Sequence, residues 1–493
     1  MTHERDERSE GRGEGASRNP SVPEVERFFV TDRRVGWFVG SLTLTATQVS
    51  AGTLVGAVGL HYLFGVSFAA AWPGIWLGWF VSMYYVAPQM RRFGGVTVPE
   101  YLAARFDGDG AGGRRVLALA STLVGLVYLV FTAAQYVAGG VVVETVLGVP
   151  RIYGMAAIMA VTLAYTAVGG MRASILTDVV LAALMILGVV VAAFVGVGSV
   201  GGPAALFEGV RSVDASLLGF AMPLDELLGF ALAFGIAMTV APYQISRVYA
   251  MADEATVRTA IKGTVAVQFV IAVCITVLGL VAVVSFPDLA EPDAAVAELI
   301  VSLFGPVAGW LLLAALVAAV VSTLDSVLLV SASSVAYDLY LGVLRGEAAE
   351  DRTSQEAGPS QHRRSMNLST QDGDKALFVA RSATVVAGVV PFALALRSGL
   401  LGELVQVIVA LFASLVAGML FAPVVLGIHW EGATTRGAVA GVITGFAVVV
   451  AWHFLWTVYD VLPGLLGHVP TAAAGVLCGG GAVVAVSFLE NRT

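Results

Sequence analysis

Long apolar segments constrain this chain more than any other feature of its sequence. Between short clusters of charge lie runs of about 20 apolar residues, the length that an α-helix needs to cross a membrane. Only 13% of the residues are charged, about half the fraction that soluble domains carry. We therefore predict an all-α polytopic membrane protein, and we exclude a soluble enzyme, a nucleic-acid-binding protein and a disordered chain. Twelve segments meet this description, near 35–58, 66–88, 116–146, 152–169, 174–200, 226–250, 261–286, 307–337, 376–396, 403–428, 435–458 and 467–488.

The polar parts of the chain gather at its start and in one long connection. Residues 1–34 predict a disordered cytoplasmic arm, and residues 346–374 predict a disordered cytoplasmic loop, because both are polar and lack apolar periodicity. The short apolar stretch 294–304 lies between two prolines and predicts a helix at the membrane interface. These three segments separate or flank the twelve expected spans.

Lysine and arginine residues predict the orientation. With twelve spans and both termini in the cytoplasm, only three of the 27 basic residues fall outside, namely Arg151, Arg211 and Arg397. Cytoplasmic loops of membrane proteins carry an excess of such residues. We therefore expect a multi-pass protein of the cell membrane with both termini in the cytoplasm.

The first span contains an unusual polar stretch, TATQVSAGTLVG at 45–56. Its glycines, four residues apart, are consistent with ordinary close packing between helices. The alternative is an unwound helix whose carbonyls and hydroxyls bind an ion or a solute. Gln48 favours the second interpretation, since an amide in lipid needs a partner.

The sixth span contains MTVAPYQISR at 238–247. Pro242 removes one helical hydrogen bond, and Tyr243 and Gln244 place polar groups beside the gap. A simple proline kink explains this pattern equally well. However, spans one and six run in opposite directions, five helices apart, so they occupy corresponding places in two inverted repeats. Interrupted helices at corresponding places indicate a transport site.

The eighth span carries adjacent hydroxyl groups, Ser322 and Thr323, one turn after Ala319. Each hydroxyl can simply bond back to the carbonyl four residues earlier. Alternatively, paired hydroxyls beside a free carbonyl form an oxygen cage for a small monovalent cation.

Asp178 lies within the fifth span, where an acid either reaches the interface or carries a function.

Span three presents Tyr128 and Gln135 on one helical face, seven residues apart. Hydrogen bonding between helices and a contribution to a solute site are both consistent with this stripe. Glu144, at the outer end of the same span, fits a solvated charge at the interface. The glycines of GAVAGVITG at 437–445 predict a seam of close helix packing.

The sequence carries no nucleotide-binding loop, zinc motif or nucleophile elbow, and its histidines form no ligand pair. Cys274 and Cys478 both lie in apolar runs, so neither a disulfide framework nor a metal cluster is expected. We therefore predict no enzyme activity and no organic cofactor.

Several segments, in this order, resemble the sodium:solute symporter family, which includes proline, pantothenate, sugar and monocarboxylate cotransporters. The resemblance implies a LeuT-like fold of five plus five helices in inverted repeat, with helices one and six of the core broken. It places a ten-helix core at 35–428, with repeats at about 35–200 and 226–428, and two peripheral helices at 435–488. The resembling segments are ATQVSAGTLVGAVGLHYLFG (46–65), TVPEYLAARF (97–106), AYTAVGGMRASILTD (164–178), PYQISRVYAMAD (242–253) and STLDSVLLVSASSVAYDLY (322–340).

The resemblance also implies site residues. The family's sodium ligands fall on the backbone carbonyls of Ala46, Val49 and Ala319 and on the hydroxyls of Ser322 and Thr323. The family's acid on core helix five falls on Asp178, which we expect on the path of sodium release. The implied solute contacts are Gln48, Ser50, Ala51, Thr53, Tyr128, Gln135, Tyr243 and Gln244.

We therefore expect a sodium-coupled symporter that imports a small polar organic solute by alternating access. An amino acid such as proline, a pantothenate-like vitamin and a monocarboxylate are the candidate solutes. A proton-coupled transporter of the same fold, with Asp178 as proton carrier, is the alternative, and a channel or a membrane sensor is a more distant one. The expected partners are the lipid bilayer and the solute, with no nucleic acid and no obligate protein partner. Many family members have a spanning helix ahead of the core, and no apolar segment precedes Val35 here.

Overall fold

The computed structural model describes residues 24–106, 110–304, 306–344, 370–397, 404–459, 461 and 468–492. These residues form helices joined by turns, with one isolated bridge between Val35 and Met251. In the first half of the chain the elements are α1 Glu24–Val30, α2 Trp37–Gln48, η1 Gly52–Gly56, α3 Ala57–Phe64, η2 Gly65–Ala71, α4 Trp72–Val81, η3 Ser82–Val86, α5 Ala87–Phe93, α6 Val98–Arg105, α7 Ala111–Leu147, α8 Arg151–Ser199, α9 Pro203–Asp214 and η4 Ala215–Leu218. In the second half they are α10 Leu224–Val240, α11 Pro242–Ala250, α12 Glu254–Ser285, η5 Pro292–Ala294, α13 Ala295–Leu303, α14 Pro306–Ser333, η6 Ser334–Leu344, α16 Thr370–Ala395, α17 Val405–His429, α18 Thr435–His453, η9 Phe454–Val458 and α19 Thr471–Glu490.

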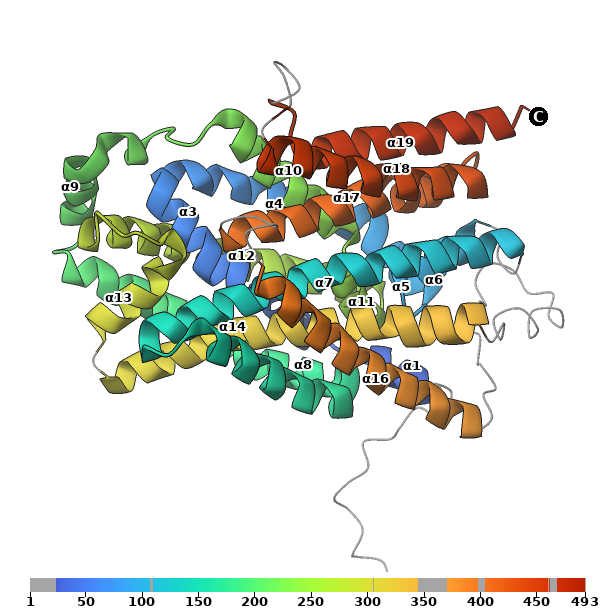
Figure 1. Cartoon of the computed structure of the whole chain (residues 1–493), viewed down its shortest axis with the longest axis horizontal. Coiled ribbons are helices and arrows are strands. Elements are labelled where there is room, and N and C mark those ends of the chain that lie inside the picture. The colour runs from blue at the N-terminus through green and yellow to red at the C-terminus, as the bar shows by residue number, and fades with distance from the viewer. Residues whose placement is uncertain are drawn as a thin grey trace, which may run out of the picture.

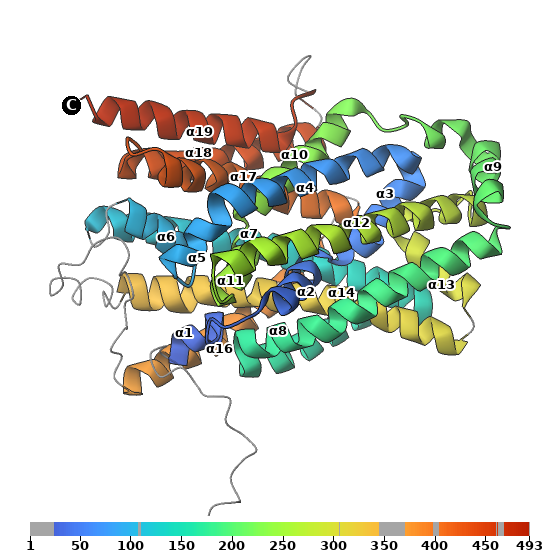
Figure 2. The same cartoon turned by 180° about the vertical axis from the view of Figure 1, so that it is seen from behind.

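The long helices lie side by side in one bundle (Figure 1). The short helices α9 and α13 lie at one end of this bundle, and α1, α5 and α6 lie toward the other, where the C-terminus is also found. Seen from behind, α2 lies among α8, α12 and α14 (Figure 2), and it packs against all three. The central position of α2 makes its polar stretch an internal feature of the bundle.

Ten helical stretches among the described residues are long and apolar enough to cross a membrane. The count falls below twelve partly because α8 holds two of the expected spans, 152–169 and 174–200, joined by a kink at Gly170. Gly170 has φ 56°, a left-handed conformation that favours glycine. A Cβ there would lie 2.6 Å from the backbone oxygen of Phe28. The number of spans, twelve, stays a prediction.

The expected disordered arm is too long at its C-terminal end. Residues 24–30, within the predicted arm of 1–34, form α1, which packs against α8, α11 and α16. Phe29 and Val30 are buried there because the apolar run FFV has a hydrophobic surface to cover. Residues 1–23 lie outside the described part of the chain. Residues 346–369 of the predicted loop also lie outside it, whereas 370–374 form the start of α16.

Two helices are interrupted deep inside the bundle. The chain leaves helical geometry after α2, at Val49 with ψ 88°, and resumes as the π-helical turn η1. It leaves helical geometry again at Ala241, with ψ 121°, between α10 and α11. The second interruption follows from Pro242, because a proline disfavours the α conformation of the residue before it. These places coincide with the two polar stretches of spans one and six.

The last two long helices, α18 and α19, form a pair that packs on α17 along one side of the bundle (Figure 1). The predicted glycine seam at 437–445 is confirmed. A Cβ on Gly445 would lie 1.9 Å from the carbonyl oxygen of Gly418 on α17, and one on Gly441 would lie 3.1 Å from that of Gly479 on α19. The predicted short helix at 294–304 is present as α13.

Candidate functional site

The interruption of α2 leaves backbone carbonyls free in the middle of the bundle, since the last residues of a helix have no helical donor. Two hydroxyls of α14 reach these carbonyls. Ser322 donates to the carbonyl of Ala46 at 3.0 Å, and Thr323 donates to the carbonyl of Thr47 at 3.2 Å. Both side chains are fully buried. The adjacent hydroxyls therefore join α14 to the broken end of α2.

The same contacts bear on the expected cation ligands. Ser322 also lies 3.2 Å from the carbonyl of Ala319, so Ala46, Ala319 and Ser322 are brought together with Thr323 beside them. Val49 lies at the interruption, where its N–H bonds to the carbonyl of Thr45 at 2.7 Å. The back-bonding interpretation accounts for part of the geometry of Ser322, but the Thr323 hydroxyl turns toward the other helix.

Asp178 lies in a charged cluster beside these hydroxyls. Its carboxylate is 3.3 Å from the guanidinium of Arg247, and that guanidinium is 3.6 Å from the carboxylate of Asp325. All three side chains are fully buried. Thr43 donates a hydrogen bond to Asp178, and Tyr165 donates one to Asp325 at 2.9 Å. One of the two interpretations placed the Asp178 carboxylate at the membrane interface. The structure instead buries it in this cluster.

Ser326 connects the charged cluster to the hydroxyl pair. It accepts a hydrogen bond from Arg247 at 2.6 Å and donates to the carbonyl of Ser322 at 3.0 Å. Its oxygen is also 3.1 Å from that of Thr47. A change at Arg247 can thus reach Ser322 through Ser326, and a change at Asp178 can reach it through Arg247 and Ser326.

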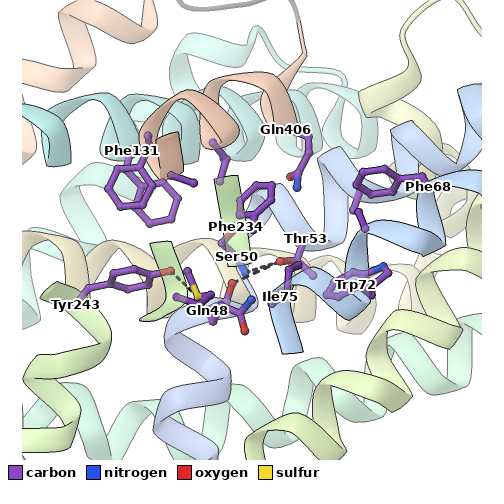
Figure 3. A pocket seen from close by; sticks show the side chains of 16 residues that line it. Gln48, Ser50, Thr53, Phe68, Trp72, Ile75, Phe131, Phe234, Tyr243 and Gln406 are labelled. Carbon is purple, nitrogen blue, oxygen red and sulfur yellow. Dashed lines mark hydrogen bonds between the residues drawn. The ribbon is translucent and has the colours of Figure 1, made fainter. Parts of the chain in front are cut away.

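A small cavity of about 30 Å³ lies beside the interruptions of both helices (Figure 3). It is large enough for a water molecule or two. Four of the expected solute contacts line it: Gln48, Ser50, Thr53 and Tyr243. Gln406 of α17 faces the same space, and none of the described residues that line it is charged.

The other expected solute contacts do not line the cavity, and two of their side chains hold the interrupted backbone instead. Gln135 accepts a hydrogen bond from the N–H of Ala51 at 3.1 Å, and the Tyr128 hydroxyl accepts one from the N–H of Tyr243 at 2.9 Å. Gln244 is buried outside this lining, and its amide has no hydrogen-bond partner among the described residues. These three side chains therefore support the backbone or lie behind it.

The sequence analysis missed most of the apolar wall of this cavity. Its aromatic and aliphatic members come from η2, α4, α7, α10 and α17, where they resemble lipid-facing residues in the sequence. They are Phe68, Trp72, Ile75, Phe131, Phe234, Met238, Val409 and Phe412. The analysis also counted Arg247 as one more basic residue of the cytoplasmic side, whereas the structure buries it. Its position five residues after Pro242, inside an apolar span, was the available signal.

The family model of the sodium:solute symporters matches residues 28–358. This chain belongs to that family. Similar symporters include the high-affinity proline transporter PutP of Bacillus subtilis, 28% identical over 457 residues, with 89% of each chain covered. The sodium/proline symporter of Escherichia coli is 27% identical and is covered to 90%, against 92% of this chain. The sodium/pantothenate symporter of the same organism is also 27% identical and is covered to 88%, against 90% of this chain.

Solved structures share the fold of this symporter. A Na⁺-coupled sialic acid symporter in a substrate-bound outward-open state superposes with a TM-score of 0.74 at 18% identity, over 95% of this chain and 93% of that one. MhsT in complex with L-phenylalanine superposes with a TM-score of 0.51 at 14% identity, over 93% and 99%. The predicted LeuT-like fold is therefore confirmed, and the family consists of transporters rather than enzymes.

Proposed function

We propose that this chain imports a small polar solute without net charge, driven by sodium that binds between α2 and α14. The observation that carries the proposal is the contact of the Ser322 and Thr323 hydroxyls with the free carbonyls of Ala46 and Thr47. Carbonyls at an interrupted helix, together with hydroxyl groups, are the ligands that sodium-coupled transporters of this kind offer to the ion. The coupling ion is the only cofactor that the proposal needs.

Sodium fits this oxygen set without a large rearrangement. The hydroxyl protons that now point at the carbonyls would turn away, and the freed lone pairs of Ser322, Thr323, Ala46 and Ala319 would face the ion. The Val49 carbonyl, at the interruption, completes the proposed set. A divalent metal site would need a group of acidic, histidine or cysteine ligands. No group of three or more such residues occurs among the described residues.

The cavity beside this site supports a solute that combines an apolar body with hydrogen-bonding groups. Its wall is largely apolar, and its polar groups are the amides of Gln48 and Gln406 and the hydroxyls of Ser50, Thr53 and Tyr243. Since no charged residue lines it, a net charge on the solute would be left uncompensated. The relatives whose names mention proline and pantothenate suggest two solutes. L-Proline is a zwitterion without net charge and fits this lining, whereas a pantothenate-like acid carries one negative charge and is disfavoured by it.

Asp178 serves sodium release in this proposal. It contacts the ion site through Arg247 and Ser326 rather than directly. Ala51, Tyr128 and Gln135 serve the solute by holding the interrupted backbone around the cavity, whereas Gln244 lies behind the lining. Their roles are indirect because none of the four lines the space that the solute would occupy.

We assign the end of the bundle that carries α1, α5 and α6 to the cytoplasm of the cell, with the protein in the plasma membrane. The exposed Arg92 and Arg114 lie near that end, and the excess of Lys and Arg in this set of loops supports the assignment. Both termini are then cytoplasmic, as the sequence predicts.

The test is uptake of labelled solutes into proteoliposomes that contain the purified chain. L-Proline, pantothenate and lactate are offered with an inward sodium gradient, and with potassium in place of sodium. Saturable, sodium-dependent uptake of L-proline is the expected result, and uptake of the anions pantothenate or lactate instead contradicts the proposed preference for a solute without net charge. Uptake that is unsaturable or equal in both salts contradicts the proposal, since a channel or a leak behaves in that way.

A further inference from the structure

A second cavity, of about 300 Å³, lies behind the central one. The helices α10 and α17 form the wall between the two spaces. On α17, Val409 and Phe412 face the central cavity, whereas Val407 and Leu411 face the second one. On α10, Phe234 faces the central cavity.

The other residues of α10 that matter here lie closer to its start. Phe230 and Glu226, one and two turns before Phe234, line the second cavity. The far wall comes from the C-terminal helices, through His453 and Trp456.

Charge in this second cavity has one sign. The carboxylate of Glu226 takes part in no ion pair among the residues that the structure describes, and no Lys or Arg lines the space. The neighbouring Asp225 is already bonded to His468, at 2.8 Å. Glu226 is therefore an exposed acid at the rim of an open apolar pocket, and an anionic ligand would find no counter-charge in the part of the lining that the structure describes.

His453 adds a second polar group. Its side chain is 5% exposed, and its Nε2 atom has no hydrogen-bond partner among the described residues. A buried ring nitrogen without a partner is costly unless a ligand or a water completes it. The cavity thus offers an acid at one side, an unpartnered nitrogen at another and apolar surface between them.

We propose that this second cavity binds an organic ammonium ion with an apolar body. The ammonium group lies at Glu226, and the apolar body packs between Phe230, Val407 and Leu411. Because α10 and α17 also line the solute site, the bound amine changes the rate of transport without competing for that site. The binding does not depend on sodium-coupled transport, whereas its effect on uptake rests on the proposed function.

Binding to the purified full chain in phosphatidylglycerol vesicles tests this proposal. The probe is phenylethylammonium, compared with phenylethanol and phenylpropionate, which have similar bodies but no positive charge. We expect the ammonium compound to bind, and Glu226→Gln to weaken it roughly tenfold or more. Glu208→Gln, an exposed acid on α9, is the matched control and should leave the affinity unchanged. Ala410→Phe should abolish binding by filling the cavity.

The remaining arms identify the source of the amine and the outcomes that overturn the proposal. Weaker binding of the probe in phosphatidylethanolamine vesicles assigns the cavity to the lipid head group, and equal binding assigns it to a free amine. Equal binding of phenylethanol, or an affinity unaffected by Glu226→Gln, overturns the proposal. Competition with the solute that the uptake assay identifies also overturns it, because it places the amine in the central cavity. None of the binding results requires transport. A failure of the proposed transport function can therefore be told apart from a failure of amine binding.

Discussion

At the scale of single residues, the hydroxyls of Ser322 and Thr323 carry the proposed sodium site. Replacing both by Ala removes two oxygen ligands while leaving a well-tolerated helical residue in α14. We expect the sodium concentration for half-maximal uptake to rise at least about tenfold, the factor for a loss of about 1.4 kcal/mol. Ser331→Ala, a similarly buried hydroxyl further along α14, is the control. An unchanged sodium dependence in an active double variant would remove these hydroxyls from the site.

Arg247 compensates two buried carboxylates, those of Asp178 and Asp325. Arg247→Leu leaves both acids without a cation, and breaking a buried pair in this way costs about 3–5 kcal/mol. We expect a marked drop in thermal stability in detergent, measured against Arg258→Leu, an exposed position on α12. Equal melting temperatures for the two variants would show that the charged cluster is not a structural element.

Asp293 predicts a pH dependence of stability. Burial raises the pKa of its carboxyl group to about 6, although the N–H of Val405 donates to it at 2.8 Å. The folded protein therefore binds this proton more tightly than the unfolded chain, so stability is greatest below the unfolded pKa and falls as the pH rises to about 6. Two pKa units correspond to roughly 3 kcal/mol as an upper value. Asp293→Asn should remove this dependence in melting curves between pH 4 and 8, whereas Asp288→Asn, which is exposed, should keep it.

At the scale of elements, the sequence indicated the interruptions better than the ends of the helices. Pro242 has a direct backbone effect, and the Ser, Gly and Thr residues after Gln48 give up helical stability, so both gaps left a local signal. The kink at Gly170 and the packing of α1 left little signal in the sequence, because α1 packs where the chain bends at Gly170. Phe28 reaches Gly170 across 142 residues of chain, a contact that periodicity within either segment does not reveal.

The segment that joins α1 to α2 is held by contacts to the C-terminal end of α11 and to Gly95. Arg33 donates to the carbonyls of Gly95 and Tyr249, at 3.1 and 3.4 Å, and Val35 pairs with the backbone of Ala250. Arg33 also has φ 56°, an uncommon conformation for a residue other than glycine. We expect Arg33→Ala to loosen these contacts and speed the thiol labelling of a Ser246→Cys reporter in a background without Cys274 and Cys478. The same reporter with Arg34→Ala provides the comparison, and equal labelling rates would show that the contacts of Arg33 do not limit access to α11.

At the scale of the whole molecule, the sequence predicted the helical class and the order of the apolar segments, because twenty-residue apolar runs have few other uses. The arrangement of those helices came from the family resemblance and not from periodicity. The composition of the solute cavity remained hidden for a physical reason. Trp72, Phe234 and Phe412 face inward from helices whose other faces are equally apolar, so no contrast marks the lining.

Coupling between sodium and solute is also a property of the whole molecule. If sodium joins α2 to α14 beside the solute cavity, each ligand must raise the affinity for the other by the same factor, typically about 5- to 150-fold. Asp178→Asn should slow net uptake while it leaves equilibrium solute binding in saturating sodium nearly unchanged. Paired binding isotherms and uptake rates check this expectation, and a loss of equilibrium binding would move Asp178 into the solute site.

The central claim is that sodium, rather than protons, drives accumulation. The direct measurement is uptake of L-proline, the solute named for several relatives, into proteoliposomes under separately imposed sodium and proton gradients. The account predicts accumulation above the external concentration with an inward sodium gradient at equal pH, and its loss in the Ser322→Ala, Thr323→Ala double variant. Accumulation driven by a proton gradient in the absence of sodium, and abolished by Asp178→Asn, would contradict the account.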